Sequence, residues 1–278
     1  MIFTALITIG IFILGFWLNK KHDERKEFDS LMEVKSYFLQ LIEILIKSSE
    51  TQIKAFKDIA GFLKEKKDNS FNIDFSSNFT TRYIDEIPNE KLFKIFITYK
   101  PDKEKPISLF KDLVVNLGFI RHVESEWEDS YKDFNRRYWK WTEEYFQYDK
   151  QITDFIDQVL HSFQDMETLK KDEFLFQFLD IRTKWHKIPN YQDRHIREEH
   201  FINPIFQLCQ RMPKDPRILE LLSPIRGCIY TFSQIKRIKE DYSKLFGHYH
   251  QHLINALSTI QKNLAEIEKY EDTRPSII

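Results

Sequence analysis

The longest regular pattern in the chain is FKDLVVNLGFIRHVESEWEDSYKDFNRRYWKWTEEYFQYDKQITDFIDQVLHS, residues 110–162. Sixteen positions in it follow one another at alternating spacings of three and four residues, and fourteen of them are apolar or aromatic. This spacing places the side chains on one face of an α-helix, and no proline interrupts it. The pattern therefore predicts a helix of about 55 residues, which would be about 80 Å long.

Two sets of side chains on this helix are expected to be buried. The packed seam is predicted to contain Trp127, Tyr138, Trp141 and Tyr145. A second apolar set runs beside it and consists of Trp139, Phe146, Ile156, Leu160 and Phe163. A helix that is apolar on two flanks is expected to lie between neighbours in a bundle.

Two further long helices are predicted from the same kind of spacing. One follows the first twenty or so residues and ends near Lys67, and the other runs from about Pro224 to Tyr270. Short helices are expected between the long ones, because three good N-cap residues each precede a proline: Asn203-Pro204, Asp215-Pro216 and Ser223-Pro224. The predicted fold is all-α: a coiled-coil-like, antiparallel bundle of long helices with a cap of short helices at about residues 166–223.

Composition argues against several functional classes. The 42 basic and 43 acidic side chains leave a formal net charge of −1, so the chain lacks the basic excess of most nucleic-acid-binding domains. A nucleic-acid partner is therefore not expected. With only 6 glycines the sequence contains no Gly-rich phosphate loop, and no cofactor is predicted. Cys209 and Cys228 form no CxxC motif and are expected to be buried thiols.

The first residues predict a membrane anchor. Residues Ile2 to Leu18 carry no charge, and as a helix they would span about 26 Å of a hydrocarbon core about 30 Å thick. A signal peptide would have a basic residue before the apolar run and small residues after it, and this sequence has neither. Four basic residues follow the run instead: Lys20, Lys21, Arg25 and Lys26. Residues 1–22 are thus expected to anchor the chain once in the plasma (inner) membrane, with residues 23–278 as a cytoplasmic helical domain.

Residues 194–200 read RHIREEH and contain the most suggestive motif. The motif resembles the Arg-x4–6-His signature of HEPN-type ribonucleases, and the resemblance covers these seven residues. It implies an all-α dimer that cuts RNA without a metal. It also implies that Arg194 binds phosphate, that His200 acts as acid or base, and that His195 replaces the polar residue after the arginine.

Helix geometry offers another interpretation of the same residues. In a regular helix Arg194 and His200 would point about 120° apart, so they could meet only at a frayed or distorted helix start. The alternative is a surface helix on which Arg197 pairs with His200, and His195 with the glutamate at 198 or 199. His248 and His252 would likewise share a helix face and could bind a metal at two points. No HExxH glutamate accompanies them, and packed or solvated histidines are the alternative.

Taken together, these patterns favour a membrane-anchored helical interaction, scaffold or sensor protein over an enzyme. Its expected partners are the lipid bilayer, through Ile2 to Leu18, and another protein or a second copy of the chain. Self-association is expected because the helix next to the membrane carries its own heptad stripe. The alternative function is a membrane-attached, HEPN-like ribonuclease effector that uses Arg194 and His200.

Overall fold

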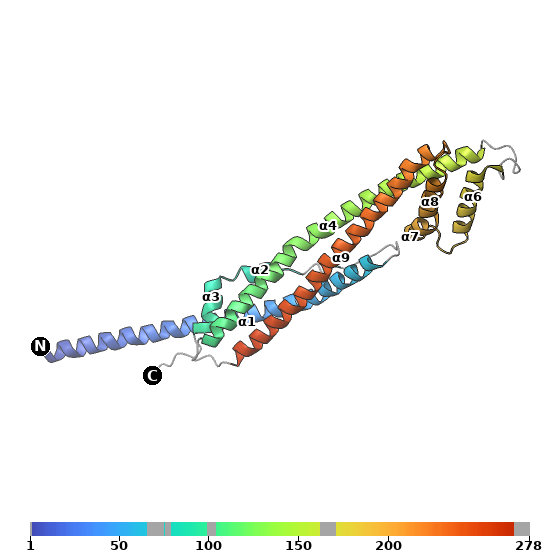
Figure 1. The fold of residues 1–278 in the computed structure, drawn as a ribbon. Coiled ribbons are helices and arrows are strands. Elements are labelled where there is room, and N and C mark those ends of the chain that lie inside the picture. The colour runs from blue at the N-terminus through green and yellow to red at the C-terminus, as the bar shows by residue number, and fades with distance from the viewer. Residues whose placement is uncertain (1, 66–74, 76–78, 99–103, 162–170, 270–278) are drawn as a thin grey trace. The chain divides into compact units, whose positions relative to one another are not determined.

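The computed structural model describes residues 2–65, 75, 79–98, 104–161 and 171–269, with side chains from Ile9 onward (Figure 1). Every regular element in these residues is helical, which confirms the all-α prediction. Residue contacts divide the chain into two compact units. Unit 1 comprises Met1–Phe56, Asp74–Trp127 and Tyr249–Ile278, and unit 2 comprises Lys57–Ile73 and Glu128–His248. Each unit contains a segment of the three long helices, α1 (Ile2–Lys64), α4 (Glu104–His161) and α9 (Ile218–Glu268).

The helix lengths agree with the sequence pattern better than the helix ends do. Helix α4 has 58 residues, close to the predicted length. The expected start of the last helix at Pro224 is wrong, because α9 begins at Ile218 and Pro224 lies inside it. A proline inside a helix costs about 3 kcal/mol. Leu221 and Ile225 on either side are fully buried, each stabilising the fold by about 1.5–3 kcal/mol, and their burial offsets this cost.

Helices α4 and α9 run antiparallel, because rising residue numbers on α4 meet falling numbers on α9. In unit 1 the pairs are Lys105 with Glu266 (3.8 Å) and Phe119 with His252 (ring centroids 5.0 Å apart). In unit 2 they are Phe134 with Tyr242 (5.5 Å) and Trp141 with Tyr230 (5.7 Å). Aromatic rings thus make much of the contact between the two helices.

Helix α1 runs parallel to α4 in unit 1. Phe56 contacts Trp127 at 6.3 Å, whereas Phe38, earlier on α1, contacts Phe96, which in turn contacts Phe110 near the start of α4. Two helices joined in sequence can run parallel only if the chain between them returns to the start of the first. Here the described part of the connection lies beside Phe38 of α1 and Phe110 of α4. The connection carries α2 (Arg82–Asp85), α3 (Asn89–Phe93) and the π-helix η1 (Lys94–Thr98).

Sixteen regularly spaced positions form what we call the apolar stripe of α4, and Glu124 and Ser162 are its two polar members. The position of Glu124 has a structural reason. Its carboxylate accepts hydrogen bonds from Thr80 Oγ1 (2.6 Å), from the backbone N–H of Thr81 (2.8 Å) and from Thr81 Oγ1 (2.9 Å). These bonds hold the residues that lead into α2. Ser162, the other polar position of the stripe, lies outside the described residues.

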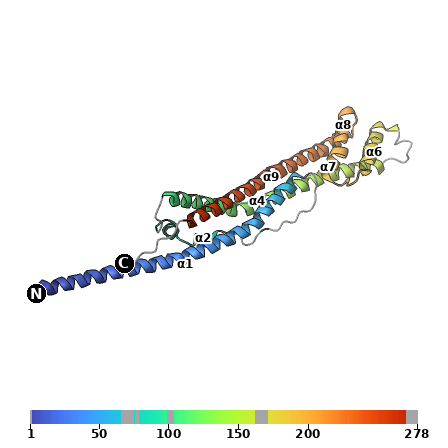
Figure 2. The same cartoon turned by 90° about the horizontal axis from the view of Figure 1, so that it is seen from below.

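Unit 2 contains the remaining short helices: α6 (Glu173–His186), α7 (Arg194–Arg197), the π-helix η2 (Glu198–Ile202) and α8 (Asn203–Arg211) (Figure 2). They share one core with α4 and α9, whose fully buried side chains include Tyr145, Phe174, Phe178, Phe201, Leu208 and Leu221. Asp215 lies in the turn before α9, where its side chain accepts from the backbone N–H of Arg217 at 3.0 Å, and the helix itself begins at Ile218. Asn203 is no cap, since helical backbone continues from η2 into α8.

Arg217, directly before α9, connects the start of α9 to the start of α6. Its guanidinium donates to both carboxylate oxygens of Asp172, at 2.8 and 2.9 Å, and also bonds to Asp215. Asp172 in turn caps α6 by accepting from the backbone N–H of Leu175 at 3.0 Å. We call this arrangement of Arg217, Asp172 and Asp215 the Arg217 clamp.

The second apolar set on α4 was expected to be buried, and the structure corrects this in part. Trp139 and Phe146 are 63% and 55% exposed, so the second flank of α4 is not buried at these positions, although Ile156 is. In the part of the chain whose side chains are described, no helix has the length and apolar content that crossing a membrane requires. The expected span of Ile2 to Leu18 includes residues 2–8, whose side chains lie outside the described residues.

We expect the two glycines of α9 in unit 2 to respond in opposite ways to alanine. A methyl group on Gly227 would lie 2.5 Å from Cγ of Tyr148 on α4, whereas nothing lies within 4 Å of such a group on Gly247. Gly227→Ala should lower the free energy of unfolding by about 1–3 kcal/mol through the clash. Gly247→Ala should raise it by about 0.5–1 kcal/mol through helix propensity. Urea unfolding followed by circular dichroism measures both, and equal stabilisation by the two substitutions would contradict the close approach.

Candidate functional site

The RHIREEH motif lies at a helix start that is followed by a π-helical turn. Asp193 caps α7, and its side chain accepts from the backbone N–H of His195 at 2.8 Å. The helix then widens into η2 over Glu198–Ile202, a geometry that is frequent at functional sites. The polar side chains of the motif consequently point into different surroundings.

Arg194 points into the core of unit 2. Its side chain is buried, and its guanidinium donates to Thr142 Oγ1 at 2.7 Å and to the Tyr138 hydroxyl at 2.6 Å. Both partners belong to α4, so Arg194 ties the motif to that helix. In this arrangement the guanidinium satisfies buried hydroxyl groups, which is a structural role.

Arg197 also points inward and forms an ion pair with Asp149 of α4, not with His200 as the surface-helix alternative expected. Its guanidinium stacks over the rings of Trp185 (4.5 Å) and Phe201 (5.0 Å). Burial raises the pKa of Asp149, and the charge of Arg197 partly opposes that rise. The pair is therefore held in an apolar environment, where either partner alone would be costly.

Glu198 is a buried titratable group of unit 2. The residue is 3% exposed, and the neighbouring Tyr145 hydroxyl acts on its carboxyl and lowers the carboxyl pKa. Burial raises the pKa of the Glu198 carboxyl to about 7, and Asp149 contributes to the rise. Burial likewise raises the pKa of the Tyr145 hydroxyl far above its usual value. Glu198 thus changes charge near neutral pH inside the core.

The two histidines of the motif lie apart from Arg194. The His195 ring contacts Phe232 of α9, with centroids 4.9 Å apart, and lines a surface cavity. His200 is exposed, and its Nε2 atom lies 4.0 Å from Glu199 Oε1. The structure therefore does not bring Arg194 and His200 into one constellation, because one side chain is in the core and the other faces solvent.

The cavity beside His195 has a volume of about 390 Å³ and is lined by side chains from α1, α7 and α9. We call it the lysine pocket, because four lysines line it together with His195: Lys64, Lys236, Lys239 and Lys244. No local sequence pattern predicts this pocket. The only signal for it was the basic stretch KRIK at residues 236–239, which has no functional meaning without its neighbours from α1.

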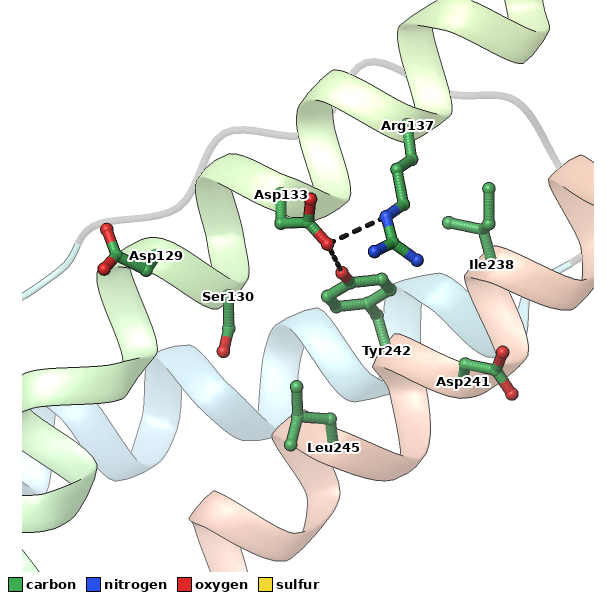
Figure 3. A pocket seen from close by; sticks show the side chains of 8 residues that line it. All are labelled: Asp129, Ser130, Asp133, Arg137, Ile238, Asp241, Tyr242 and Leu245. Atoms are coloured by element: carbon green, nitrogen blue, oxygen red, sulfur yellow. Dashed lines mark hydrogen bonds and ion pairs between the residues drawn. The ribbon is translucent and has the colours of Figure 1, made fainter.

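A second groove of about 410 Å³ lies between α4 and α9 in unit 2 (Figure 3). Asp133 faces Tyr242 across it, accepts the tyrosine hydroxyl hydrogen and pairs with Arg137 at 2.8 Å, while Asp129 and Asp241 point away. The hydrogen bond from Tyr242 lowers the pKa of Asp133, with further lowering from its arginine neighbours. The polar groups at the centre of this groove satisfy one another, so it links two helices and offers little to a ligand.

His248 and His252 do not become part of a larger ligand set. Both are exposed, and the His252 ring lies 5.0 Å from Phe119 of α4. Between them, His250 has its Nδ1 atom 3.1 Å from the carbonyl oxygen of Ile53. In the described residues, no three His, Cys, Asp or Glu side chains gather in a way that could hold a metal ion.

Comparison of the chain with models of known protein families, with characterised proteins and with solved structures finds no match.

We expect Arg194 and His200 to differ sharply in what their loss costs. Arg194→Ala removes two hydrogen bonds and leaves the buried hydroxyl of Thr142 without its arginine donor, so the free energy of unfolding should fall by about 2–4 kcal/mol. His200→Ala removes an exposed side chain and should change it by less than about 0.5 kcal/mol. Urea unfolding of the full chain tests both values. If purified protein cleaves RNA and His200→Ala abolishes cleavage without loss of stability, the structural interpretation of the motif is wrong.

Glu198 should make the stability of the fold depend on pH near neutrality. Its folded-state pKa of about 7 lies above the ordinary value of 4.5, so the folded chain binds more protons than the unfolded chain between these values. The free energy of unfolding should therefore fall as the pH rises through this window. Glu198→Gln should be more stable than the wild type by about 3 kcal/mol at alkaline pH and similar to it at acidic pH.

The matched control for this prediction is Glu199→Gln, which alters the neighbouring exposed carboxyl. Its unfolding curve should follow that of the wild type at every pH. If Glu198→Gln also follows the wild type at every pH, Glu198 is not the group that titrates.

Proposed function

We propose that the chain is a membrane-anchored helical scaffold or sensor protein that holds its helical units at the inner face of a membrane. One observation carries the proposal, namely the exposed surface of α1 from Ile9 to Leu18. Eight large apolar side chains there are exposed by between 39% (Trp17) and 74% (Phe12): Ile9, Ile11, Phe12, Ile13, Leu14, Phe16, Trp17 and Leu18.

These side chains point in all directions around the helix, so no single packed face could bury them. A helix that is apolar on every side belongs in a protein core or in a lipid bilayer. No other described segment of this chain covers residues 9–18. The residues before them, Ile2 to Thr8, carry no charge in the sequence, and together the two stretches approach the length of a hydrocarbon core.

The basic residues after the apolar stretch support one orientation. Lys20, Lys21, Arg25 and Lys26 follow it within a few residues. Positive residues next to a span favour the cytoplasmic side. We therefore propose a single-pass anchor in the plasma (inner) membrane, with everything after residue 22 in the cytoplasm.

The proposed role as an interaction protein rests on apolar side chains that are exposed on the surface of the units. The heptad stripe of α1 that predicted self-association is buried within unit 1, with Phe38 and Leu45 almost fully covered. A second copy or another protein would therefore have to bind elsewhere. In unit 2, Trp139 and Phe146 are one such exposed pair, because residues seven apart lie on the same face of a helix. The ribonuclease alternative finds no comparable support, since Arg194 is occupied in the core by Tyr138 and Thr142.

Membrane attachment can be tested by placing charges in the exposed apolar stretch. Phe12→Lys combined with Ile13→Lys should cost about 5–7 kcal/mol of insertion free energy, because each lysine near the middle of a span costs about 2.5–3.5 kcal/mol. We expect the full wild-type chain to stay with membranes after extraction at alkaline pH, and the double variant to appear in the supernatant. Immunodetection of both fractions after ultracentrifugation measures the distribution.

The matched control is Ile44→Lys, which alters an apolar side chain of similar exposure (56%) on the same helix but outside the proposed span. This variant should remain in the membrane fraction. Release of the wild type by alkaline extraction, or retention of the double variant, would refute the anchor.

A further inference from the structure

The lysine pocket of unit 2 carries an excess of positive charge. Besides its four lysines, two glutamates line it, Glu65 and Glu240, so two positive charges remain in excess with His195 counted as neutral. The chain as a whole has a net charge of −1. This concentration of positive charge in one cavity is therefore a local feature and does not follow from overall composition.

Two of the lysines have structural partners. Lys239 is 7% exposed and donates to the backbone carbonyl of Glu65 at 2.9 Å, just beyond the end of α1, where cations near a helix C-terminus are favourable. Lys244 pairs with Glu240 at 2.7 Å, one turn away on α9. The positive charge of Lys239 is thus fixed in the wall of the pocket, while Lys244 and Glu240 largely neutralise each other.

Among the described residues the other two lysines form no ion pair, although Lys236 lies 5.8 Å from the ring centroid of Phe232 and helps to lower the pKa of Glu240. Lys64 comes from the last turn of α1 and Lys236 from α9, and both are exposed. They reach the same cavity from different helices, and the fold therefore brings together two ammonium groups that lie far apart in the sequence.

From these observations we propose that the lysine pocket binds a small molecule that bears phosphate groups. A phosphate monoester carries a charge of about −1.5 to −2 at neutral pH, which matches the excess of two positive charges. Lysine binds phosphate as a flexible point charge, and Lys64 and Lys236 can each contact a different oxygen. The fixed charge of Lys239 adds attraction from the wall.

The size of the cavity suits this class of ligand. Its volume of about 390 Å³ lies within the range of about 300–1,000 Å³ that is common for small-molecule sites. The wall also has an apolar part, to which Leu63 contributes. A soluble phosphorylated metabolite and the phosphorylated headgroup of a lipid share the chemistry recognised here. The proposal does not depend on membrane attachment.

Isothermal titration calorimetry on the full chain in a nonionic detergent tests the proposal. The two probes are inorganic pyrophosphate, for a soluble ligand, and a short-chain phosphatidylinositol phosphate, for a lipid headgroup. We expect saturable binding of at least one probe, weakened by added salt. The double variant Lys64→Gln/Lys236→Gln should reduce the affinity about tenfold or more, because it removes two charge-assisted contacts. The probe that binds more tightly identifies the source of the ligand.

The matched control is Lys57→Gln/Lys262→Gln, which removes the same charge from exposed positions of α1 and α9 outside the pocket. Its affinity should stay within about twofold of the wild type, as expected for screened charges away from the site. Circular dichroism confirms that both double variants are folded. The proposal is overturned if neither probe binds saturably to the folded wild type, or if both double variants weaken binding equally.

Discussion

The apolar stripe of α4 has to be covered along its length, and the arrangement of each unit follows from this requirement. Antiparallel α9 covers part of the stripe in both units through paired aromatic rings such as Phe134 and Tyr242. The rest is covered differently in each unit: by α1 and η1 in unit 1, and by the short helices around Phe178 and Phe201 in unit 2. Close contact between α4 and α9 at Tyr148 is possible because Gly227 has no side chain there.

Much of the fold could be predicted from the sequence, because helix periodicity is a local property. The long helices, their approximate lengths and the all-α class follow from spacings of three and four residues. The ends of helices were less predictable, since tertiary burial competes with local signals. Pro224 suggested a helix start, yet the burial of Leu221 and Ile225 continues the helix on both sides of it. Asn203 suggested a cap, yet the π-helical turn carries the backbone through it.

The candidate site was far less predictable, because its contacts join residues distant in the sequence. The spacing of Arg194 and His200 suggested a shared role, but the partners of Arg194 are Tyr138 and Thr142 on another helix. The same holds for the lysine pocket, where α1 and α9 contribute charges that no local pattern connects. A motif of a few residues indicates a catalytic site only when the fold brings its side chains together. In this fold Arg194 is buried and His200 is exposed.

The Arg217 clamp also bears on the order in which the chain assembles. It joins the start of α6 to the start of α9, so the two ends of the short-helix region are held together by residues 45 positions apart. The contact of Lys105 with Glu266 closes a much longer loop, and the entropy lost on loop closure grows with length. Pairing of α4 with α9 is therefore expected to begin beside the clamp and to extend from there toward Lys105 and Glu266.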